Sequence, residues 1–291
     1  MAGQAASDEG YVACGWTHDK QLQSSYDSHL KLFYTAHDHG VWSIGTDVIL
    51  KERPYDGSRN EAKALKLLAS YSQNPAPELL HDWVDQDGRY FLLQERMDGD
   101  TLETVWPTLT DLQKVAIADQ VAGVCKRLQF ITSPRIERVD RRACSSTLLF
   151  GDSEPHGPFR SDAELWDAVS LPLRQRSFPQ KALDSLQKRF PQYASYVLTH
   201  GDLSIGNIMV KDGQLVGILD WEHAAYYPLG YEYILASWGV NAEDVAWKRL
   251  LQQRLDLKDS AKWFWMELYH LRNYPDLDEE GKEVLERLSA Q

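Results

Sequence analysis

The chain has 291 residues, 43% hydrophobic and 25% charged, which are ordinary values for a globular protein with two lobes or one large domain. A formal net charge of −12 argues against a nucleic-acid-binding protein and weakly favours a cationic or neutral small-molecule substrate. No apolar run reaches the roughly 18 residues of a membrane span, and the three cysteines lack metal-ligand spacing, so we expect a cytoplasmic protein without a membrane partner.

Three strand-like runs open the patterned part of the chain. They are Leu30–Thr35, Val41–Ile44 and Asp47–Glu52, and short connections with glycine separate them. The third run is apolar and ends in a cation, Lys51. The first connection, Ala36–Gly40, contains a single glycine. These features predict a small antiparallel sheet near the N-terminus.

A helix and a second hairpin follow. The helical segment S-R-N-E-A-K-A-L-K-L-L-A-S begins with a capping-box pattern, in which Ser58 caps the helix and Glu61 reaches back to its first residue. The runs Leu79–Val84 and Arg89–Gln94 then flank Asp87–Gly88, which is a favoured hairpin turn. The second of these strands leads into E-R-M-D-G.

From residue 97 onward the pattern is mainly helical. Thr110–Gln113 is a second capping box, and it opens a long helix with one apolar face. Residues 130–180 are interrupted by prolines and carry a basic cluster that we interpret as a solvated face. We expect a helix over Leu183–Tyr196 and two or three more helices after residue 240.

The stretch Val197–Glu222 carries the candidate chemistry. It contains His200, Asp202 and Asn207 in the order H-G-D-L-S-I-G-N, followed by two short apolar runs around the turn Asp212–Gly213. The tripeptide alone could be a turn with a capping aspartate. The complete set of loop, asparagine, hairpin and following aspartate favours a functional site over that simple turn.

The aspartate that ends this hairpin is Asp220. If the turn pairs Lys211 with Gln214, then Asn207 lies across from Ile218, and its side chain projects from the same face as that of Asp220. The two residues would be diagonal neighbours, roughly 7–8 Å apart before their side chains converge. Two oxygen ligands at such positions suit a hard cation such as Mg²⁺.

The order H-x-D-x-x-x-x-N, hairpin, Asp resembles the catalytic and metal loops of protein-kinase-like folds. The absence of an arginine after His200 and the ending I-L-D-W-E are similar to the aminoglycoside-phosphotransferase and choline-kinase group. G-P-F-R-S-D and W-E-H-A-A-Y-Y-P resemble fungal members most closely, although His223 and Ala225 depart from the fungal pattern.

The resemblance implies an α+β, bilobal, protein-kinase-like fold. Residues 1–96 would form a small nucleotide-binding lobe with an antiparallel sheet, and residues 97–291 a larger, mainly helical catalytic and substrate lobe. It also implies transfer of the γ-phosphoryl group of ATP to a hydroxyl group of a small molecule. Asp202 would be the catalytic residue, and Asn207 and Asp220 would hold Mg²⁺.

The nucleotide-binding residues are implied by the same resemblance. Lys51 would bind the α- and β-phosphates beneath the connection Ala36–Gly40, and Glu61 would orient Lys51 through an ion pair. This role competes with the cap that Glu61 would form on its own helix. Main-chain groups of Glu95 and Met97 would bind the edge of adenine.

Two alternatives remain open at this point. The acceptor could be that of a choline-, homoserine- or macrolide-type kinase, or the protein could be a catalytically silent nucleotide-binding protein on the same fold. Acidic residues could also line a cleft for an aminocyclitol, but a solvated acidic surface is the favoured interpretation. These residues are Glu232, Glu243, Asp244 and those in 276–280.

Overall fold

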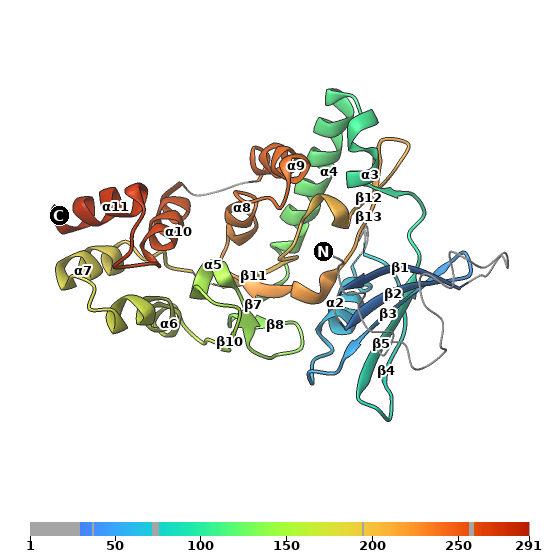
Figure 1. Cartoon of the computed structure of the whole chain (residues 1–291), viewed down its shortest axis with the longest axis horizontal. Helices are drawn as coiled ribbons and strands as arrows, with labels where there is room; N and C mark the ends of the chain where they lie inside the picture. The colour runs from blue at the N-terminus through green and yellow to red at the C-terminus, as the bar shows by residue number, and fades with distance from the viewer. Residues whose placement is uncertain (1–29, 37, 72–75, 194, 256–258, 291) are drawn as a thin grey trace, which may run out of the picture. The chain divides into compact units, whose positions relative to one another are not determined.

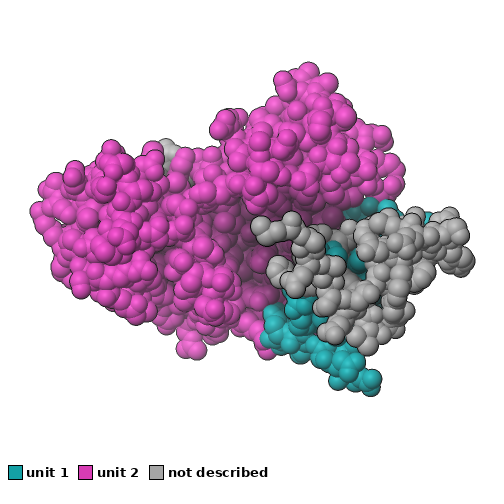
Figure 2. All heavy atoms as spheres, viewed as in Figure 1, with its two compact units in different colours: residues 1–58, 77–97 teal, residues 59–76, 98–291 magenta. Residues whose placement is uncertain are grey.

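A computed structural model describes residues 30–36, 38–71, 76–193, 195–255 and 259–290. The chain divides into two compact units, Met1–Ser58 with Pro77–Met97 and Arg59–Ala76 with Asp98–Gln291, which are coloured separately in Figure 2. The second unit thus includes residues 59–76, whereas the sequence-based lobes, 1–96 and 97–291, remain a prediction. Among the described residues, no helix is long and apolar enough to cross a membrane.

The first unit is built on one antiparallel sheet of five strands, in the order β1-β2-β3-β5-β4 (Figure 1). The strands are β1 (Leu30–Ala36), β2 (His39–Ile44), β3 (Val48–Pro54), β4 (Leu79–Val84) and β5 (Arg89–Glu95). The predicted N-terminal antiparallel sheet is therefore confirmed. Gly88, in the predicted turn, has a φ of 75°, a conformation that glycine adopts without strain.

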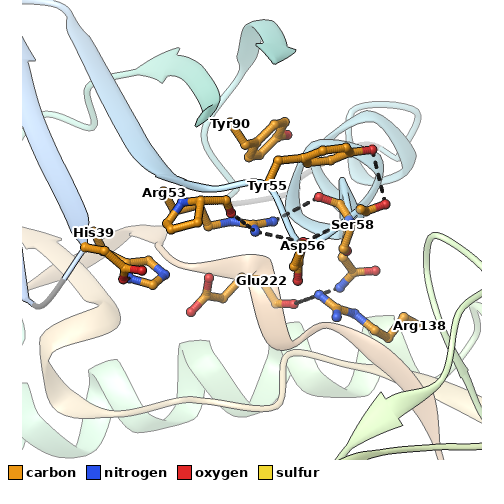
Figure 3. A network of polar contacts seen from close by, with 12 residues as sticks. His39, Arg53, Tyr55, Asp56, Ser58, Tyr90, Arg138 and Glu222 are labelled. Atoms are coloured by element: carbon orange, nitrogen blue, oxygen red, sulfur yellow. Dashed lines mark hydrogen bonds and ion pairs between the residues drawn. The ribbon is translucent and has the colours of Figure 1, made fainter. Parts of the chain in front are cut away.

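The turn after β3 is held by its own side chains (Figure 3). Arg53 donates hydrogen bonds to the Asp56 carboxylate at 2.9 Å and to the Ser58 carbonyl oxygen at 3.0 Å. The Ser58 N–H donates to Asp56 at 2.8 Å. Helix α2 (Asn60–Leu68) consequently begins two residues later, with Arg59 at its N-cap and no side-chain capping bond. The N-cap is thus Arg59 and not Ser58 as predicted, and the Ser58 N–H, which Glu61 was expected to accept, donates to Asp56.

Asn60 attaches helix α2 to the rest of the second unit. Its side chain is fully buried, and its amide nitrogen donates to the carbonyl oxygens of Glu222 and Ala224, each at 2.8 Å. Its amide oxygen accepts from the Asp140 N–H at 3.1 Å. The Glu222 carbonyl also accepts from Arg138 at 3.2 Å (Figure 3). One asparagine thus satisfies three main-chain groups far apart in the sequence.

Replacing Asn60 by alanine is expected to lower the free energy of unfolding by roughly 2–4 kcal/mol, since buried main-chain groups would lose their partners. Chemical denaturation measures the effect. The matched control is Asn273→Ala, which removes an exposed asparagine. Equal stability of the two variants would contradict the bridging role of Asn60.

The second unit contains two small sheets that position the candidate site. One has the order β13-β12-β6, and the other has the order β7-β11-β14-β8. The strands are β6 (Asp100–Thr101), β7 (Thr132–Ser133), β8 (Glu137–Arg138), β11 (Tyr196–Thr199), β12 (Ile208–Lys211), β13 (Gln214–Ile218) and β14 (Ala225–Tyr227), and a separate pair joins β9 (Cys144–Ser145) to β10 (Pro155–His156). Asp212 and Gly213, with φ of 51° and 74°, form the predicted hairpin turn between β12 and β13.

Helices outweigh strands in the second unit, as predicted. They are α3 (Leu102–Val105), α4 (Asp111–Leu128), α5 (Thr147–Phe150), α6 (Asp162–Gln175), α7 (Gln180–Lys188), α8 (Tyr231–Leu235), α9 (Ala242–Gln252), α10 (Asp259–Leu271) and α11 (Glu279–Ala290). The capping box of Thr110 and Gln113 at the start of α4 is confirmed. The helix expected over Leu183–Tyr196 is wrong in its extent, because α7 ends at Lys188, shortly before Pro191.

Two groups of apolar side chains contribute to the core of the second unit. The predicted apolar face of α4 is buried, from Ile117 to Leu128. A second group joins α6 and α10 through aromatic rings, since Trp166 and Phe264 each pack against Phe190 with centroids 5.6 and 5.2 Å away. Helices α7, α10 and α11 pack side by side near this group (Figure 1). The two cores hold the helices that surround the candidate site.

Candidate active site

The loop after β11 places His200, Gly201 and Asp202 in a tight turn. Gly201 has a φ of 87°, and a Cβ atom at this position would lie 2.7 Å from the carbonyl oxygen of His223. Any residue with a side chain would therefore be strained both by its backbone conformation and by this contact. The close approach explains why glycine, rather than the arginine of protein kinases, precedes Asp202.

His200 braces the loop through both of its ring nitrogens. Nε2 lies 2.8 Å from the carbonyl oxygen of Leu219, and Nδ1 accepts the N–H of Asp202 at 3.2 Å. The ring is buried, with its centroid 4.5 Å from that of Trp221. Burial lowers the pKa of His200 to about 4, so the imidazole is neutral near pH 7. These hydrogen bonds brace the loop from His200 to Asp202 against Leu219.

Asn207 lies at the end of a 3₁₀ turn, Ile205–Asn207, and contacts Asp202. Its amide nitrogen donates to the Asp202 carboxylate at 3.0 Å and to the Asp202 carbonyl oxygen at 3.1 Å. Ser204 adds its N–H and its hydroxyl to the same carboxylate, at 3.3 and 3.4 Å. The carboxylate is thereby fixed in direction, while the amide oxygen of Asn207 remains the atom of that side chain suited to a cation.

The register of the β12–β13 hairpin differs from the predicted one. The pairing shifts by one residue between Met209 and Val210. As a result Asn207 lies opposite Leu219, whose N–H donates to the Asn207 carbonyl oxygen at 2.8 Å, and not opposite Ile218. The predicted pairing is wrong because a β-bulge adds one residue to the second strand.

Asp220 follows the bulged strand in a left-handed conformation, with φ and ψ both 64°. Aspartate tolerates this conformation better than most residues, and the turn changes the direction of the side chain relative to a regular strand. The main-chain bond between Leu219 and Asn207 keeps this end of the hairpin next to the 3₁₀ turn. The amide oxygen and the carboxylate are hard oxygen donors, so this donor set fits Mg²⁺.

Glu232, on helix α8, is buried against the same loop. Its Oε1 accepts the N–H of Gly201 at 2.7 Å, and the side chain is 8% exposed. Burial raises the pKa of Glu232 to about 7 against the opposing effect of the hydrogen bonds from the main chain of Gly201 and His200. The charge of Asp202 raises this pKa further, and Lys248 lowers it. Glu232 therefore ties α8 to the loop from His200 to Asp202, and its charge changes near neutral pH.

Substitution Glu232→Gln should change how stability depends on pH. The folded-state pKa of about 7 exceeds the unfolded value of 4.5, so the wild-type protein loses stability as the pH rises through this window. The variant lacks this proton linkage. The free energy of unfolding of the variant, minus that of the wild type, should therefore rise by roughly 2–3 kcal/mol between pH 4.5 and pH 7.

Denaturation at a series of pH values tests this expectation. Glu243→Gln, which alters an exposed carboxylate at the start of α9, is the matched control and should show no such gain. A difference between the Glu232 variant and the wild type that is constant with pH would contradict the raised pKa.

A cavity of about 330 Å³ lies beside Asp202 within the second unit. Its lining includes the loop from Gly201 to Leu203 and side chains from α8, α9 and α10, among them Glu232 and Lys248. Arg272, directly after α10, also lines it. Cavities of this size hold small ligands, so the Asp202 carboxylate is within reach of a bound small molecule.

The acidic residues considered from the sequence have different roles. Of that set, only Glu232 is among the described residues that line the cavity. Asp244 is fully buried and accepts the N–H of Ile205 at 2.8 Å and that of Val240 at 3.1 Å. The Lys248 ammonium lies 3.2 Å from the same carboxylate. Asp244 thus supports the loop that carries the site. Lys248 and Arg272 have no distinguishing spacing in the sequence, and they were not predicted.

Of the predicted nucleotide-binding residues, the first unit holds Lys51, Glu95 and Met97. Lys51 is half-buried within β3, where it pairs with Val41 and Leu92, and the strand continues beyond it to Pro54. The sequence suggested that Lys51 lies at the end of the strand, and this expectation is wrong. Glu61 belongs to the second unit, and its ion pair with Lys51 stays a prediction. In the predicted phosphate-binding connection, His39 begins β2, and residue 37 lies outside the described residues.

The end of β5 presents its main chain in a defined direction. The N–H of Arg96 donates to the Asp47 carbonyl oxygen at 2.8 Å, toward β3. Because successive residues of an extended chain alternate, the main-chain groups of Glu95 point the other way. There the Glu95 N–H donates to Glu78 at 2.9 Å. The strand ends at Glu95, and the binding of adenine by the main chain of Glu95 and Met97 stays a prediction.

A family model described as the phosphotransferase enzyme family, APH, matches residues 39–269, which is well over half of the chain. The chain belongs to this family. The matched region contains the catalytic loop, the hairpin and most of the cavity lining. No curated protein sequence matches the chain significantly.

Solved aminoglycoside phosphotransferases share the fold of this phosphotransferase. APH(4)-Ia is 15% identical, with a TM-score of 0.57 over 94% of this chain and 95% of the other. A complex of APH(2'')-IIa with streptomycin and ATP is 14% identical, with a TM-score of 0.53 over 91% and 92%. A GDP complex of aminoglycoside 2'-phosphotransferase-IIIa is 18% identical, with a TM-score of 0.53 over 93% and 95%. The predicted kinase-like α+β fold is thereby confirmed.

Two residues of this phosphotransferase depart from the pattern expected of fungal members. Ala225 is fully buried in β14, paired with Thr199, whose hydroxyl donates to the Ala225 carbonyl oxygen at 3.0 Å. The side chain of His223 is 58% exposed and lies 3.5 Å from Glu222. Neither departure disturbs the contacts of Asp202 with Asn207.

Proposed function

We propose that this phosphotransferase transfers the γ-phosphoryl group of ATP to a hydroxyl group of a small molecule. The observation that carries the proposal is the Asp202 carboxylate, held by Asn207 at 3.0 Å on the wall of a cavity of about 330 Å³. A fixed carboxylate in such a cavity is suited to orient a hydroxyl group. The ATP and GDP complexes of proteins with this fold support a purine nucleotide as the phosphoryl donor.

In the proposed reaction, Asp202 orients the acceptor hydroxyl and accepts its proton. A bond forms between the acceptor oxygen and the γ-phosphorus, the bond from the γ-phosphorus to the bridging oxygen breaks, and ADP leaves. Because the transition state is loose, catalysis depends mainly on positioning and on neutralisation of charge. Neutral His200 contributes by holding the main chain of Asp202 at 3.2 Å, and it transfers no proton.

Asn207 and Asp220 are the proposed ligands of Mg²⁺, through the amide oxygen and the carboxylate. The bound cation would supply positive charge to the nucleotide phosphates. The hydrogen bond from the Asn207 amide nitrogen to Asp202 supports this assignment, because it directs the amide oxygen away from the catalytic carboxylate. The same asparagine would thereby couple metal binding to the orientation of Asp202.

The first unit would bind the rest of the nucleotide. Lys51 is proposed to bind the α- and β-phosphates, and Glu61 to orient Lys51. The carbonyl oxygen of Glu95 and the N–H of Met97 form an acceptor and donor pair that matches the amino group and the adjacent ring nitrogen of adenine. The side chains of both residues are free to vary, since only main-chain groups take part.

A thermal-shift and transfer experiment tests this function. Mg²⁺ with ATP or GTP should raise the unfolding temperature of the protein, and the nucleotide alone should raise it less. Product analysis over aminoglycosides, amino alcohols and sugars should then detect a phosphorylated acceptor. Binding of the nucleotide with no transfer to any compound would instead identify a catalytically silent nucleotide-binding protein.

A further inference from the structure

A positively charged side chain, that of Arg272, lines the cavity beside Asp202 and has no role in the proposed chemistry. Four charged side chains line it: Asp202, Glu232, Lys248 and Arg272. Three of them have partners within the loop and α9. Asp202 accepts from Asn207, Glu232 accepts from Gly201, and Lys248 lies 3.2 Å from the buried Asp244 carboxylate.

Arg272 is placed differently from the other three. Its guanidinium lies over the ring of Tyr269, 3.8 Å from the centroid, and Tyr269 in turn packs against Trp238 with centroids 4.8 Å apart. Within the described part of the chain, no carboxylate lies at ion-pair distance from this guanidinium. Stacking occupies one face of the planar group and leaves its N–H donors at the edges available for hydrogen bonds.

The rest of the lining is largely apolar. Leu235 and Leu251 line the cavity together with the rings of Trp238 and Tyr269. A side chain already held by stacking loses little further conformational entropy when it binds a ligand. A guanidinium is well matched to a carboxylate or a phosphate group. A polycationic acceptor would instead meet Arg272 and Lys248, while the nearby carboxylates are already engaged. The cavity is thus poorly suited to a compound with several ammonium groups.

We propose that the acceptor is a small hydroxyl-bearing compound with an anionic group, which Arg272 binds while the aromatic and apolar lining covers the body of the molecule. This inference rests on the proposed phosphotransferase function and adds the substrate class. Arg272 and Asp202 line the same cavity, so an anion held at Arg272 directs the remainder of the acceptor along the cavity wall. The class differs from streptomycin, which is named in the complex of a protein with the same fold.

A matched set of probes separates charge from shape. Hydroxymethylbenzoate, benzenedimethanol and aminomethylbenzyl alcohol each have one ring with a hydroxymethyl group, and the second substituent is an anionic carboxylate, a neutral hydroxymethyl group or a cationic ammonium group. Hydroxymethylphenyl phosphate, in which a phosphate group replaces the carboxylate, distinguishes the two anions, and an aminoglycoside represents the polycation. Binding to the full chain is measured by ligand-observed NMR without nucleotide. This readout is independent of turnover, whereas Mg²⁺-ATP binding and phosphoryl transfer are measured separately.

The expected result is tighter binding of an anionic probe than of its neutral and cationic counterparts. Arg272→Gln should weaken that binding roughly 10- to 100-fold and leave the neutral probe unchanged. Arg249→Gln, which removes an exposed arginine of α9, is the matched control and should bind like the wild type.

Three results would overturn the inference: no binding of either anion, equal binding of the anionic and cationic probes, or equal losses in the two arginine variants. Preferred phosphorylation of an aminoglycoside would overturn it while supporting the proposed function. Anion binding at Arg272 without any Mg²⁺-ATP binding would reject the phosphotransferase function and with it the acceptor role of the anion.

Discussion

Substitution Asp202→Asn is expected to reduce phosphoryl transfer by roughly 10²- to 10⁴-fold, which is the usual contribution of a positioned general base. Asparagine can retain the contact that Asn207 makes with the Asp202 carboxylate at 3.0 Å, so the loop should keep its conformation. It cannot accept the proton of the acceptor hydroxyl. The affinity for Mg²⁺-ATP should remain close to that of the wild type.

The control for this variant is Asp212→Asn. It makes the same chemical change in the exposed hairpin turn, where Asp212 has a φ of 51° that asparagine adopts readily. Steady-state kinetics and calorimetry on both variants separate chemistry from binding. Turnover by the Asp202 variant at the rate of the control would reject Asp202 as the catalytic residue.

Substitution Asp220→Ala is expected to remove the part of nucleotide affinity that depends on Mg²⁺. The carboxylate is the only charged group in the proposed ligand pair, and a hard divalent cation depends strongly on such a ligand. We expect the affinity for Mg²⁺-ATP to fall to that for ATP in the presence of a chelator. Calorimetry with and without Mg²⁺ measures this difference.

Asp220→Asn is the companion variant, because alanine at a φ of 64° adds strain of about 1–2 kcal/mol. Asparagine tolerates this conformation and keeps one oxygen, so its affinity should lie between those of the wild type and the alanine variant. A thermal-denaturation curve checks that both remain folded. Unchanged Mg²⁺-ATP affinity in both variants would exclude Asp220 as a metal ligand.

Local sequence patterns predicted the hairpins and helices that depend on nearby residues. The turn Asp212–Gly213 and the capping box of Thr110 with Gln113 each involve residues no more than three positions apart, and the structure contains both. Such features follow from turn and cap preferences alone. The hairpins of the first unit were predictable for the same reason, whereas the pairing of β3 with β5 joins segments separated by helix α2 and β4.

The register of the β12–β13 hairpin was not predictable from its turn alone. A regular ladder extended from Lys211 and Gln214 misplaces Asn207 by one residue, because of the shift between Met209 and Val210. Gly217 in the interior of the second strand is the one local signal for an irregularity, since glycine in a strand often marks a bulge. The error matters, because it decides how the two proposed metal ligands face each other.

Contacts between distant segments account for the other differences. Ser58 looked like a helix cap, but the hydrogen bonds of Asp56 and Arg53 organise that turn, and Asn60 reaches residues more than 160 positions away. Asp244 looked like a candidate for an acidic cleft, yet it is buried as a support for the catalytic loop. The packing of Arg272 on Tyr269 leaves no trace in the spacing of residues. The proposed acceptor class therefore rests on the structure and not on the sequence.

The most direct test follows the phosphoryl group itself. The wild-type protein and the Asp202→Asn variant are incubated with Mg²⁺ and ATP labelled at the γ-phosphorus, together with a panel of aminoglycosides, amino alcohols, sugars and hydroxy acids. Label is expected on an acceptor hydroxyl in the wild-type reaction, and the variant should transfer it roughly 10²- to 10⁴-fold more slowly. Binding of Mg²⁺-ATP by the wild type with no label on any acceptor, or equal labelling by the two proteins, would contradict the assignment of this chain as a phosphotransferase that uses Asp202.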